Sequence, residues 1–371
     1  MSDHVRVGLV GIGNNACAMV QGVWRYSDPA YAERMVEGCD GIRFPRLCGY
    51  EIRDVEFSSA FDVDARKIGI DLGRAIFSPP NCYPRVVAEP IDVDVPVTAA
   101  PVLDGVPDFL AEMVHVAVES RGYMAEDHIQ RCANIVRESR THVLVNFLPS
   151  GCDLATTFFA RVAAEGGAAF INCTPTPVAH SVPLRTMFEE AGLPLLGDDL
   201  ESQFGSSLLH RTLLSALEDR GLEVSHSYQV NLGGNTDFKN LAHRPDAKRR
   251  SKMKAISTAR ARDQVDIIPS GGYVRGLGDH KVGYIVITGR GWLGTPVTID
   301  LKLEVQDSSN AAGVTIDLVR LAKGAMDQGM SGNVPLSYYF KNPLTDKLET
   351  TKALEAIHEF DRLATDRAAA I

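Results

Sequence analysis

The stretch that decides the fold is Val5-Arg6-Val7-Gly8-Leu9-Val10-Gly11-Ile12-Gly13-Asn14-Asn15-Ala16. It combines an apolar strand, a G-x-G-x-x-A turn and the start of a helix with apolar residues at helical spacing. In such a turn Gly11 permits a tight bend, Gly13 lets backbone N–H groups approach a pyrophosphate, and Ala16 allows close packing of helix on strand. We therefore predict a dinucleotide site; the alternative is a glycine-rich turn that is only structural.

Outward from this stretch, the first half of the chain alternates apolar runs with helical patterns. The runs expected as strands are Val5 to Val10, Val55 to Val63, Val114 to Val118, His142 to Leu148, Ala169 to Cys173 and Pro194 to Leu196. Between them, Glu126 to Arg140 and Asp153 to Glu165 carry apolar residues at helical spacing. This alternation is typical of βαβ units, so we predict an α/β fold with a Rossmann-type doubly wound parallel sheet.

The pattern changes near residue 200, where a long helix is expected from Ser202 to Asp219. Strand-like runs follow at Val224 to Leu232, Gly283 to Gly289 and Pro296 to Val305, and the last two flank a turn as antiparallel strands do. Helical patterns return at Ala311 to Gln328 and Thr351 to Ala369. We predict a dinucleotide-binding domain over 1–200, a second α+β domain over 201–310, and a return to the first domain over 311–371.

Composition excludes several classes of protein. The 371 residues, 45% hydrophobic and 23% charged, are ordinary for a globular chain of two domains, and no apolar run approaches the roughly 18 residues of a membrane span. The seven scattered cysteines contain no C-x-x-C pair, which favours reduced thiols over disulfides or a metal site. A net charge of -9 argues against nucleic-acid binding. Without a signal-peptide pattern at its start, the chain is expected to be cytoplasmic.

The second expected strand ends in Phe61-Asp62-Val63-Asp64. An acidic residue at this place binds the ribose hydroxyls and repels a 2′-phosphate, so Asp62 favours NAD over NADP. The distance from the glycines exceeds the usual ~20 residues, which implies an insertion from Tyr26 to Asp54. The alternative for Asp62 or Asp64 is an ordinary helix N-cap.

A second group of candidates is suited to an anion. Gly197-Asp198-Asp199-Leu200-Glu201-Ser202-Gln203-Phe204-Gly205-Ser206-Ser207 opens the long helix, and its small residues can offer N–H groups and hydroxyls to a phosphate; simple N-capping is the alternative. The segment from Arg244 to Arg262 is strongly basic, although composition alone favours a solvated helix face. Lys248 and Lys252, spaced i,i+4, would project from one face of a helix. Lysines beside a nicotinamide suggest carbonyl chemistry on a sugar phosphate.

The chain resembles the myo-inositol-1-phosphate synthases, particularly their shorter bacterial form, over nearly its whole length. The resemblance is carried by Gly11-Ile12-Gly13-Asn14, Val20-Gln21-Gly22, Phe61-Asp62-Val63-Asp64, Val145-Asn146-Phe147-Leu148-Pro149, Gly197-Asp198-Asp199, Gly233-Gly234-Asn235-Thr236-Asp237-Phe238, Asp307-Ser308-Ser309-Asn310-Ala311-Ala312-Gly313 and Ser337-Tyr338-Tyr339-Phe340-Lys341-Asn342-Pro343. It implies an NAD-binding Rossmann-type domain, an α+β domain that forms a homotetramer and much of the active site, and cyclisation of a hexose 6-phosphate. In that chemistry NAD oxidises carbon 5, carbon 6 enolises and attacks the carbon 1 aldehyde, and the hydride returns.

The resemblance also assigns candidate site residues. The catalytic set is Lys248, Lys252, Lys281, Lys341, Asp198 and Asp237. The cofactor set is Gly11, Gly13, Asn14, Asn15, Ala16, Asp62, Pro149, Asp199, Asp307 and Ala311. The substrate phosphate is assigned to Ser202, Gly205, Ser206, Ser207 and Asn235, and no metal is implied. By analogy Lys248 and Lys281 handle the carbon 5 oxygen, while Lys252 and Lys341 serve the aldol electrophile and the phosphate.

Departures from the family pattern surround the substrate. Glu201 stands where the short bacterial form has lysine, Ala247 replaces a serine, Gly283 lies in a segment that is usually more aromatic, and Asn15-Ala16-Cys17-Ala18 lacks an expected serine. These departures fit a paralogue with an altered substrate, whereas the family resemblance makes glucose 6-phosphate to myo-inositol 1-phosphate the leading hypothesis. Its rival is fructose 6-phosphate to a five-membered cyclitol phosphate, as a carbocyclic natural-product pathway needs. A net NAD-dependent sugar-phosphate dehydrogenase and a non-catalytic sensor are the further alternatives.

Overall fold

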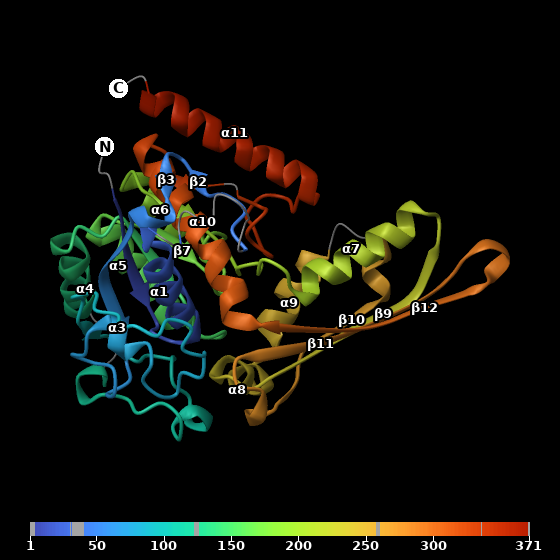
Figure 1. Cartoon of the computed structure of the whole chain (residues 1–371), viewed down its shortest axis with the longest axis horizontal. Helices are drawn as coiled ribbons and strands as arrows, with labels where there is room; N and C mark the ends of the chain where they lie inside the picture. Colours follow the sequence, from blue (N-terminus) through green and yellow to red (C-terminus); the bar gives the residue numbers. More distant parts are fainter. Residues whose placement is uncertain are drawn as a thin grey trace.

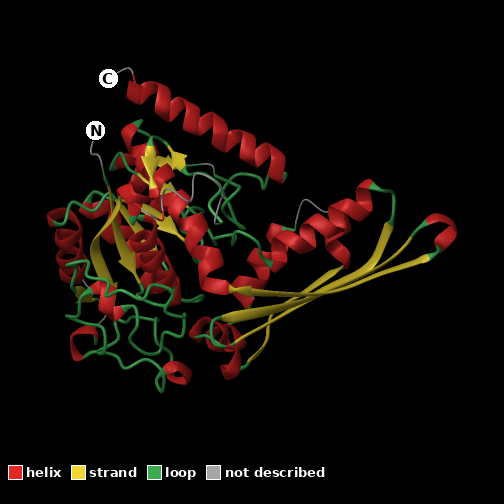
Figure 2. Ribbon diagram, in the orientation of Figure 1, coloured by secondary structure: helices red, strands yellow, loops and turns green. Residues whose placement is uncertain are grey.

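The computed structural model describes residues 4–29, 31, 41–121, 126–256, 260–334 and 336–369. A body built on a parallel sheet and a long, narrow sheet that extends away from it make up the molecule (Figure 1). Helices lie on both faces of the first sheet, whereas the second sheet carries helices along one side (Figure 2). The predicted fold class, an α/β Rossmann-type sheet with a second α+β part, is confirmed.

The first sheet has seven strands, and every neighbouring pair is parallel. Their order is β13 (Gly332–Asn333), β8 (Pro194–Leu196), β7 (Ala169–Asn172), β6 (Val143–Asn146), β1 (Val5–Val10), β4 (Val55–Asp62) and β5 (Val97–Ala99). From β1 the chain builds first toward β5, and it then returns to add β6 on the other side of β1. The strand order therefore reverses between β1 and β6, which is where open α/β sheets bind ligands.

Two helical layers bury the two faces of this sheet. The helices α1 (Asn14–Tyr26) and α10 (Asp307–Asp327) pack together over one face of the sheet. Val7 and Leu9 of β1 point toward these two helices. The opposite face, with Val10 of β1, is covered by α4 (Glu126–Glu138), α5 (Asp153–Gly166) and α6 (Val182–Glu190). Because successive side chains of a strand point to opposite faces, the apolar run of β1 supplies both cores.

The second sheet has the order β10 (Val265–Tyr273), β9 (Glu223–Gly233), β11 (His280–Arg290) and β12 (Pro296–Gln306). The strands β11 and β12 are antiparallel, as predicted, and β9 pairs in parallel with β10. One face packs against α7 (Ser206–Asp219) and α9 (Asp246–Ala255) through Leu214, Ile267, Ile285 and Ile287. Every second side chain of strand β9 therefore points toward α7 and α9.

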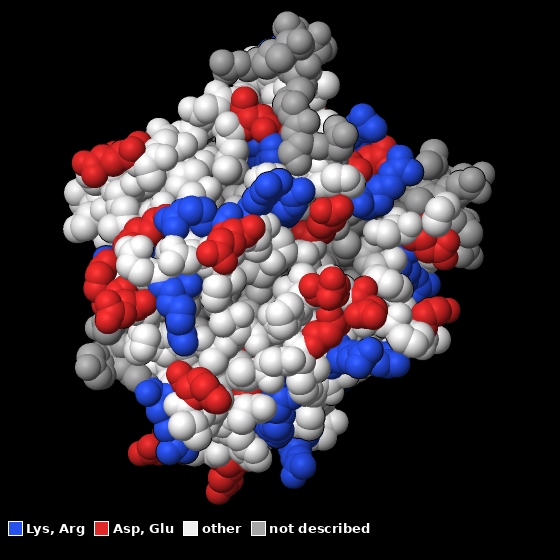
Figure 3. Space-filling model, turned by 90° about the vertical axis from the view of Figure 1, so that its left-hand side faces the viewer, with Lys and Arg blue, Asp and Glu red and all other residues white. Residues whose placement is uncertain are grey.

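The remaining elements are short or peripheral. They are β2 (Arg46–Leu47), β3 (Tyr50–Glu51), α3 (Leu72–Ala75), α8 (Thr236–His243), α11 (Thr350–Ala369) and the 3-10 turns Ile52–Asp54, Asp108–Leu110, Val118–Ser120, Arg260–Gln264, Arg275–Leu277 and Trp292–Gly294. Part of the insertion predicted between Tyr26 and Asp54 and residues 257–259 of the basic segment lie outside the described residues. Among the helices that are described, none has both the length and the apolar character needed to cross a membrane. On the face shown in Figure 3, acidic and basic side chains are intermixed.

Two predictions about elements are wrong. Val114 to Val118 forms no strand: it makes a single bridge from Val116 to Asp64, and β5 occupies the edge of the sheet beside β4. The helix expected from Ser202 begins at Ser206, because long-range bonds hold the backbone before it. The N–H of Glu201 donates to the carbonyl of Tyr339, and the N–H of Gln203 donates to that of Asn310.

Candidate active site at the strand-order switch

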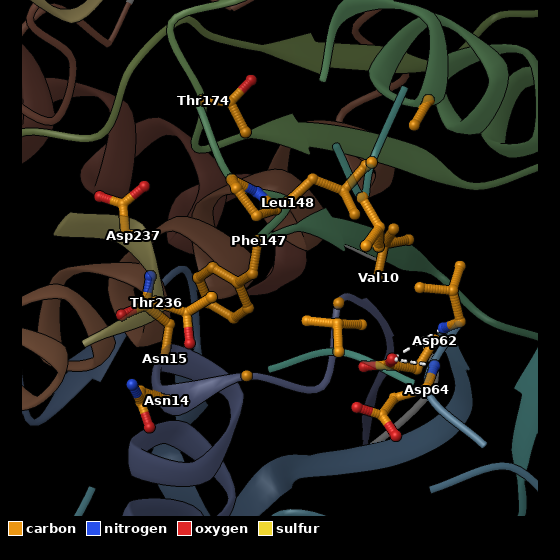
Figure 4. Close-up of a pocket in the computed structure, with 18 of the residues that line it drawn as sticks. Val10, Asn14, Asn15, Asp62, Asp64, Phe147, Leu148, Thr174, Thr236 and Asp237 are labelled. Atoms are coloured by element: carbon orange, nitrogen blue, oxygen red, sulfur yellow. Dashed lines mark hydrogen bonds between the residues drawn. The ribbon is translucent and has the colours of Figure 1, made fainter. Parts of the chain in front are cut away.

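A cavity lies where the strand order reverses, between the ends of β1 and β6. Figure 4 shows Asp62 and Asp64 at one end of it and Asn14, Asn15 and Asp237 at the other. We call it the dinucleotide cavity. The predicted cofactor residues that line it are Gly11, Gly13, Asn14, Asn15, Asp62, Pro149 and Asp307. The structure thus brings together residues at the ends of β1, β4 and β6 and at the start of α10.

The glycine loop has the geometry that its sequence predicts. Gly11 has φ of +82° and its N–H donates to the carbonyl of Phe61, so a side chain there is strained. Gly13 is the N-cap of α1, and a Cβ atom on it would meet no protein atom within 4 Å. The space beside Gly13 is therefore open toward the cavity, as backbone contact with a pyrophosphate requires.

Asp62 holds the glycine loop as well as facing the cavity. Its carboxylate accepts hydrogen bonds from the N–H of Ile12 at 2.7 Å and from the N–H of Val63 at 2.7 Å. Lys67, which the sequence analysis missed, is buried below it, and its Nζ donates to the carbonyl of Ile12 at 2.7 Å. Asp64 is buried and paired with Arg66 at 2.5 Å. Of the two acids, Asp62 is thus the one that is bonded to the glycine loop.

A second hollow, which we call the lysine pocket, adjoins the dinucleotide cavity. The predicted residues that line it are Lys248, Lys252, Lys281, Lys341, Asp237, Ser202, Gly205, Ser206 and Ser207, together with Asp307 and Ala311. Asn15, Asp237, Lys248 and Asp307 line both spaces. A molecule bound in the lysine pocket would therefore contact a ligand at the inner end of the dinucleotide cavity, which is the end that these four residues line.

Two carboxylates, those of the buried Asp199 and the partly exposed Asp307, contact three of these lysines. Asp199 is fully buried and its Oδ1 lies 2.8 Å from the Nζ of Lys248 and 3.2 Å from that of Lys341. Lys281 donates to Asp307 at 3.0 Å. Each carboxylate offsets the cost of placing an ammonium group in a poorly solvated pocket.

The pKa values of the lysines are driven apart by their partners. Burial disfavours the charged form of Lys248, but the carboxylates of Asp199 and Asp237 outweigh it and raise its pKa above the ordinary value. Burial lowers the pKa of Lys341 to about 8 despite its contact with Asp199. Burial and the neighbouring lysines lower the pKa of Lys252 well below its usual range. The pocket thus combines a fixed cation, Lys248, with an amine that can exchange protons near neutral pH, Lys341, and with Lys252, whose charged form is disfavoured.

The serine-rich end of the lysine pocket is the start of α7. Gly205 is its N-cap and no side chain caps the helix there, so the N–H groups of the first turn face the pocket region. The N–H groups just before it are already used, since that of Phe204 donates to the Asn310 side chain at 2.8 Å. We therefore expect the N–H groups of residues 205–207 to be available to an anion at this end of the pocket, which Ser202 also lines.

Three candidates lie elsewhere than predicted, and a fourth, Ala16, lines neither space. Asp199 belongs to the lysine cluster and does not line the dinucleotide cavity, and Ala311 lines the lysine pocket instead. Asn235, assigned to phosphate, lines the dinucleotide cavity, caps α8 and donates to Asp279 at 3.2 Å. Ala16 is fully buried in the packing of α1, which agrees with the role predicted for it in the turn.

Asp198 differs most from its predicted catalytic role, since it lines neither space and is fully buried. Its carboxylate accepts from the Asn172 amide at 2.7 Å and lies 3.1 Å from His180 Nδ1. Its backbone exchanges two hydrogen bonds with Asn342, next to Lys341. Asp198 is therefore placed to hold the segments that carry Asp199 and Lys341, and it does not itself reach the pocket.

We expect Asp198→Ala to lower the free energy of unfolding by about 2–3 kcal/mol, because it leaves buried donors without an acceptor. Chemical denaturation measures the change, with Asp237→Ala as the comparison. Asp237 faces the pockets, so its loss should reduce turnover more than stability. An Asp198→Ala protein of unchanged stability that has lost turnover would instead assign Asp198 to catalysis.

Two sequence departures can now be placed. Glu201 is buried and accepts from Arg211 at 3.0 Å and from Lys347, so its charge is compensated within the protein. Gly283 is buried opposite the start of α7, and a Cβ atom there would lie 3.2 Å from the Cβ of Ser206. A larger residue at this position would push against the start of α7, which lines the lysine pocket, so Gly283 helps to shape this end of the pocket.

Comparison with known proteins agrees with this geometry. The profile of the myo-inositol-1-phosphate synthase family matches residues 205–308. The inositol-3-phosphate synthase of Mycolicibacterium smegmatis is 36% identical over 92% of this chain and 95% of its own length. That of Mycobacterium tuberculosis (strain CDC 1551) is 37% identical over 97% and 96%, respectively.

Solved structures give the same result. A protein named Ari2 has 38% identity and a TM-score of 0.78, with 97% of this chain and 99% of the other covered. A myo-inositol-1-phosphate synthase-related protein from Thermotoga maritima, at 24% identity and a TM-score of 0.80 over 97% and 98% of the two chains, shares the fold. With relatives above 30% identity along almost the entire length, the chain belongs to the myo-inositol-1-phosphate synthase family.

Proposed function

We propose that this chain is an enzyme that uses NAD catalytically to convert glucose 6-phosphate into myo-inositol 1-phosphate without net oxidation. The observation that carries the proposal is the junction at Lys248, where a cluster of lysines meets the inner end of a dinucleotide cavity. The names of the relatives agree with this reaction.

The residues around the dinucleotide cavity fit NAD. The open space beside Gly13 suits a pyrophosphate, and the carboxylate of Asp62 at the far end suits the ribose hydroxyls of NAD and disfavours a 2′-phosphate. NAD supplies a reversible hydride acceptor for carbon 5 of the sugar. Because Asn15, Asp307 and Lys248 line both spaces, they are placed to orient the sugar against that acceptor.

Lys248 and Lys281 are proposed to act at the carbon 5 oxygen. Each is paired with a carboxylate, and Lys248 is the lysine of the four that also lines the dinucleotide cavity. A positive charge held beside this oxygen stabilises the oxyanion or enolate that forms when carbon 6 loses a proton. The carboxylates of Asp199 and Asp307 keep the two ammonium groups fixed, so little reorganisation is needed.

Lys341 and Lys252 are proposed to act at the other end of the sugar, near the aldehyde oxygen and the phosphate. Both line the lysine pocket with Ser206 and Ser207, and neither lines the dinucleotide cavity. The pKa of Lys341, lowered to about 8 chiefly by burial, suits a group that donates a proton to the carbon 1 oxygen as carbon 6 attacks.

Product analysis tests this proposal. With glucose 6-phosphate and catalytic NAD we expect a six-membered cyclitol phosphate by NMR and no accumulation of NADH absorbance. A parallel reaction with fructose 6-phosphate tests the rival, in which carbon 6 attacks the carbon 2 ketone and closes a five-membered ring. Turnover of fructose 6-phosphate alone would replace the proposed substrate, and stoichiometric NADH would show a net dehydrogenase. Absence of any reaction with either sugar phosphate would support the alternative that the protein is a non-catalytic sensor.

A homotetramer is part of the same proposal. The face of the second sheet opposite α7 presents Tyr228, Ile268 and Tyr284, which are 37%, 45% and 39% exposed. The register of β9, β10 and β11 sets them around Val230 and Val286 on one face. An apolar patch of this kind, bordered by Asp266 on β10 and by Asp300 and Lys302 on β12, supports burial against other copies of the chain.

A further inference from the structure

A buried glutamine contacts the lysine that has no carboxylate partner. Gln229 of β9 is 0% exposed and lies under α7. With its amide oxygen toward the lysine pocket, this atom is 2.9 Å from Lys252 Nζ and 2.9 Å from Asn231 Nδ2. The reverse orientation would set the NH₂ group against two donors, so hydrogen bonding requires the carbonyl to face Lys252.

A neutral histidine behind Gln229 supports the same orientation. The hydroxyl of Ser227 donates to the carbonyl of Val286 at 2.9 Å, and His210 Nε2 lies 2.6 Å from the same hydroxyl oxygen. Nε2 therefore carries the hydrogen, which leaves Nδ1 as an acceptor facing the Gln229 amide at 3.4 Å. Burial lowers the pKa of His210 to about 4, so the ring stays neutral at neutral pH. The amide NH₂ then points to His210 and the amide oxygen to Lys252.

The surroundings of Lys252 disfavour a permanent charge. Its side chain is 3% exposed, and it forms an ion pair with no carboxylate of the residues that the structure describes. Lys248 lies one turn away on α9, Lys281 faces it from β11, and Lys341 faces it from the loop after β13. Asp307 of α10 is the acid that acts on it, while being bonded to Lys281.

We propose that Gln229 is a positioning residue that holds Lys252 by a hydrogen bond without supplying a charge, so that Lys252 stays a neutral amine in the free enzyme and takes up a proton from solvent when an anionic phosphate enters the pocket. The inference rests on the proposed function for the identity of that phosphate, the 6-phosphate of a hexose. One N–H of the amine donates to the amide oxygen, and the lone pair of Nζ can then take up the proton.

The presence of an amide at residue 229, where a carboxylate would also fit, decides the protonation state of Lys252. A carboxylate at position 229 would pair with an ammonium group and keep it charged whether or not substrate is bound. An amide oxygen accepts the same hydrogen bond without supplying a charge. A phosphate dianion then provides the missing opposite charge, and the proton gained at Nζ turns Lys252 into both an anion ligand and a proton donor.

NMR of protein labelled at lysine Cε tests the inference, with the Lys252 signal assigned by its loss in Lys252→Met. We expect the wild-type signal to titrate below the range of ordinary lysines and to shift toward the charged form when inorganic phosphate is added at neutral pH. In Gln229→Glu the midpoint should move upward by about one pH unit or more, and phosphate should change it little. In Gln229→Met the low midpoint should persist.

The matched control is Gln264→Glu, the same substitution at an exposed site in the 3-10 turn just before the neighbouring strand β10. It should leave the titration unchanged. A Lys252 that titrates normally in the wild type, or a midpoint that Gln229→Glu does not move, would overturn the inference. Because the titration is read without turnover, these results are separate from failure of the proposed function, which would appear as absence of cyclitol product.

Discussion

Replacing Lys248 by alanine is expected to reduce turnover of glucose 6-phosphate by at least about 10³-fold, because it removes the fixed cation at the junction of the two spaces. Binding of NAD should survive within a few-fold, since Gly13 and Asp62 lie at the glycine loop and the far end of the cavity. The fold should also survive, because Asp199 keeps its contact with Lys341. Steady-state kinetics with product analysis and a direct NAD titration measure the two effects.

Arg250→Ala is the matched control for Lys248→Ala. It removes a cation from the same helix, two residues away, but from an exposed position that lines neither space. Its turnover should stay within about twofold of wild type, as surface substitutions usually do. Equal losses in both variants would mean that net positive charge of the helix matters, and unchanged turnover of Lys248→Ala would remove Lys248 from the mechanism.

The dinucleotide half of the site could be predicted from the sequence because it is local. Gly11 and Gly13 follow their strand directly, and the turn geometry depends on neighbours in the chain. Asp62 could be predicted from its position at the end of the next strand, which pairs with β1 in parallel. Neighbouring parallel strands end at the same edge of the sheet, so the glycine motif and the strand pairing both predict that Asp62 lies beside the glycine loop.

The lysine half could be predicted only in part. The i,i+4 spacing places Lys248 and Lys252 on one helix, but nothing in composition or spacing brings Lys281 or Lys341 beside them. Lys281 reaches the pocket because β11 pairs with β9, and Lys341 reaches it through backbone bonds to Asp199. Such long-range pairings have no local signal, and the family resemblance supplied these two residues.

Strand β9 did carry a signal that the sequence analysis left unused. Ser227, Gln229 and Asn231 alternate along it, and all three are fully buried, although a strand normally buries apolar residues on such a face. A polar stripe at period two predicts a hydrogen-bonded network under the helix that covers it. The sequence alone could not show whether this stripe faced the core or solvent, because only packing against α7 decides it.

Gly13→Ala is expected to weaken NAD binding by at least about 100-fold, or ~2.8 kcal/mol at 1.4 kcal/mol per tenfold change. The added Cβ atom meets no protein atom within 4 Å, so its cost falls on the ligand that the open space would hold. Stability without NAD should change by less than about 1 kcal/mol, because alanine restricts the unfolded chain and suits the φ of −92° but is a poorer N-cap than glycine. A large loss of NAD affinity without a matching loss of protein stability is the result expected for a residue whose small size leaves room for a ligand.

Two other glycines make this result interpretable. Gly22→Ala is the same substitution later on α1, also without close contacts but away from the dinucleotide cavity, and it should leave NAD binding unchanged. Gly11→Ala should instead destabilise the protein, since φ is +82° and the new Cβ would lie 3.3 Å from the carbonyl oxygen of Phe147. Calorimetric NAD titration and thermal unfolding of the three variants separate these cases. If Gly13→Ala bound NAD as the wild type does, the pyrophosphate would not lie over this turn, and the cofactor assignment of the glycine loop would fail.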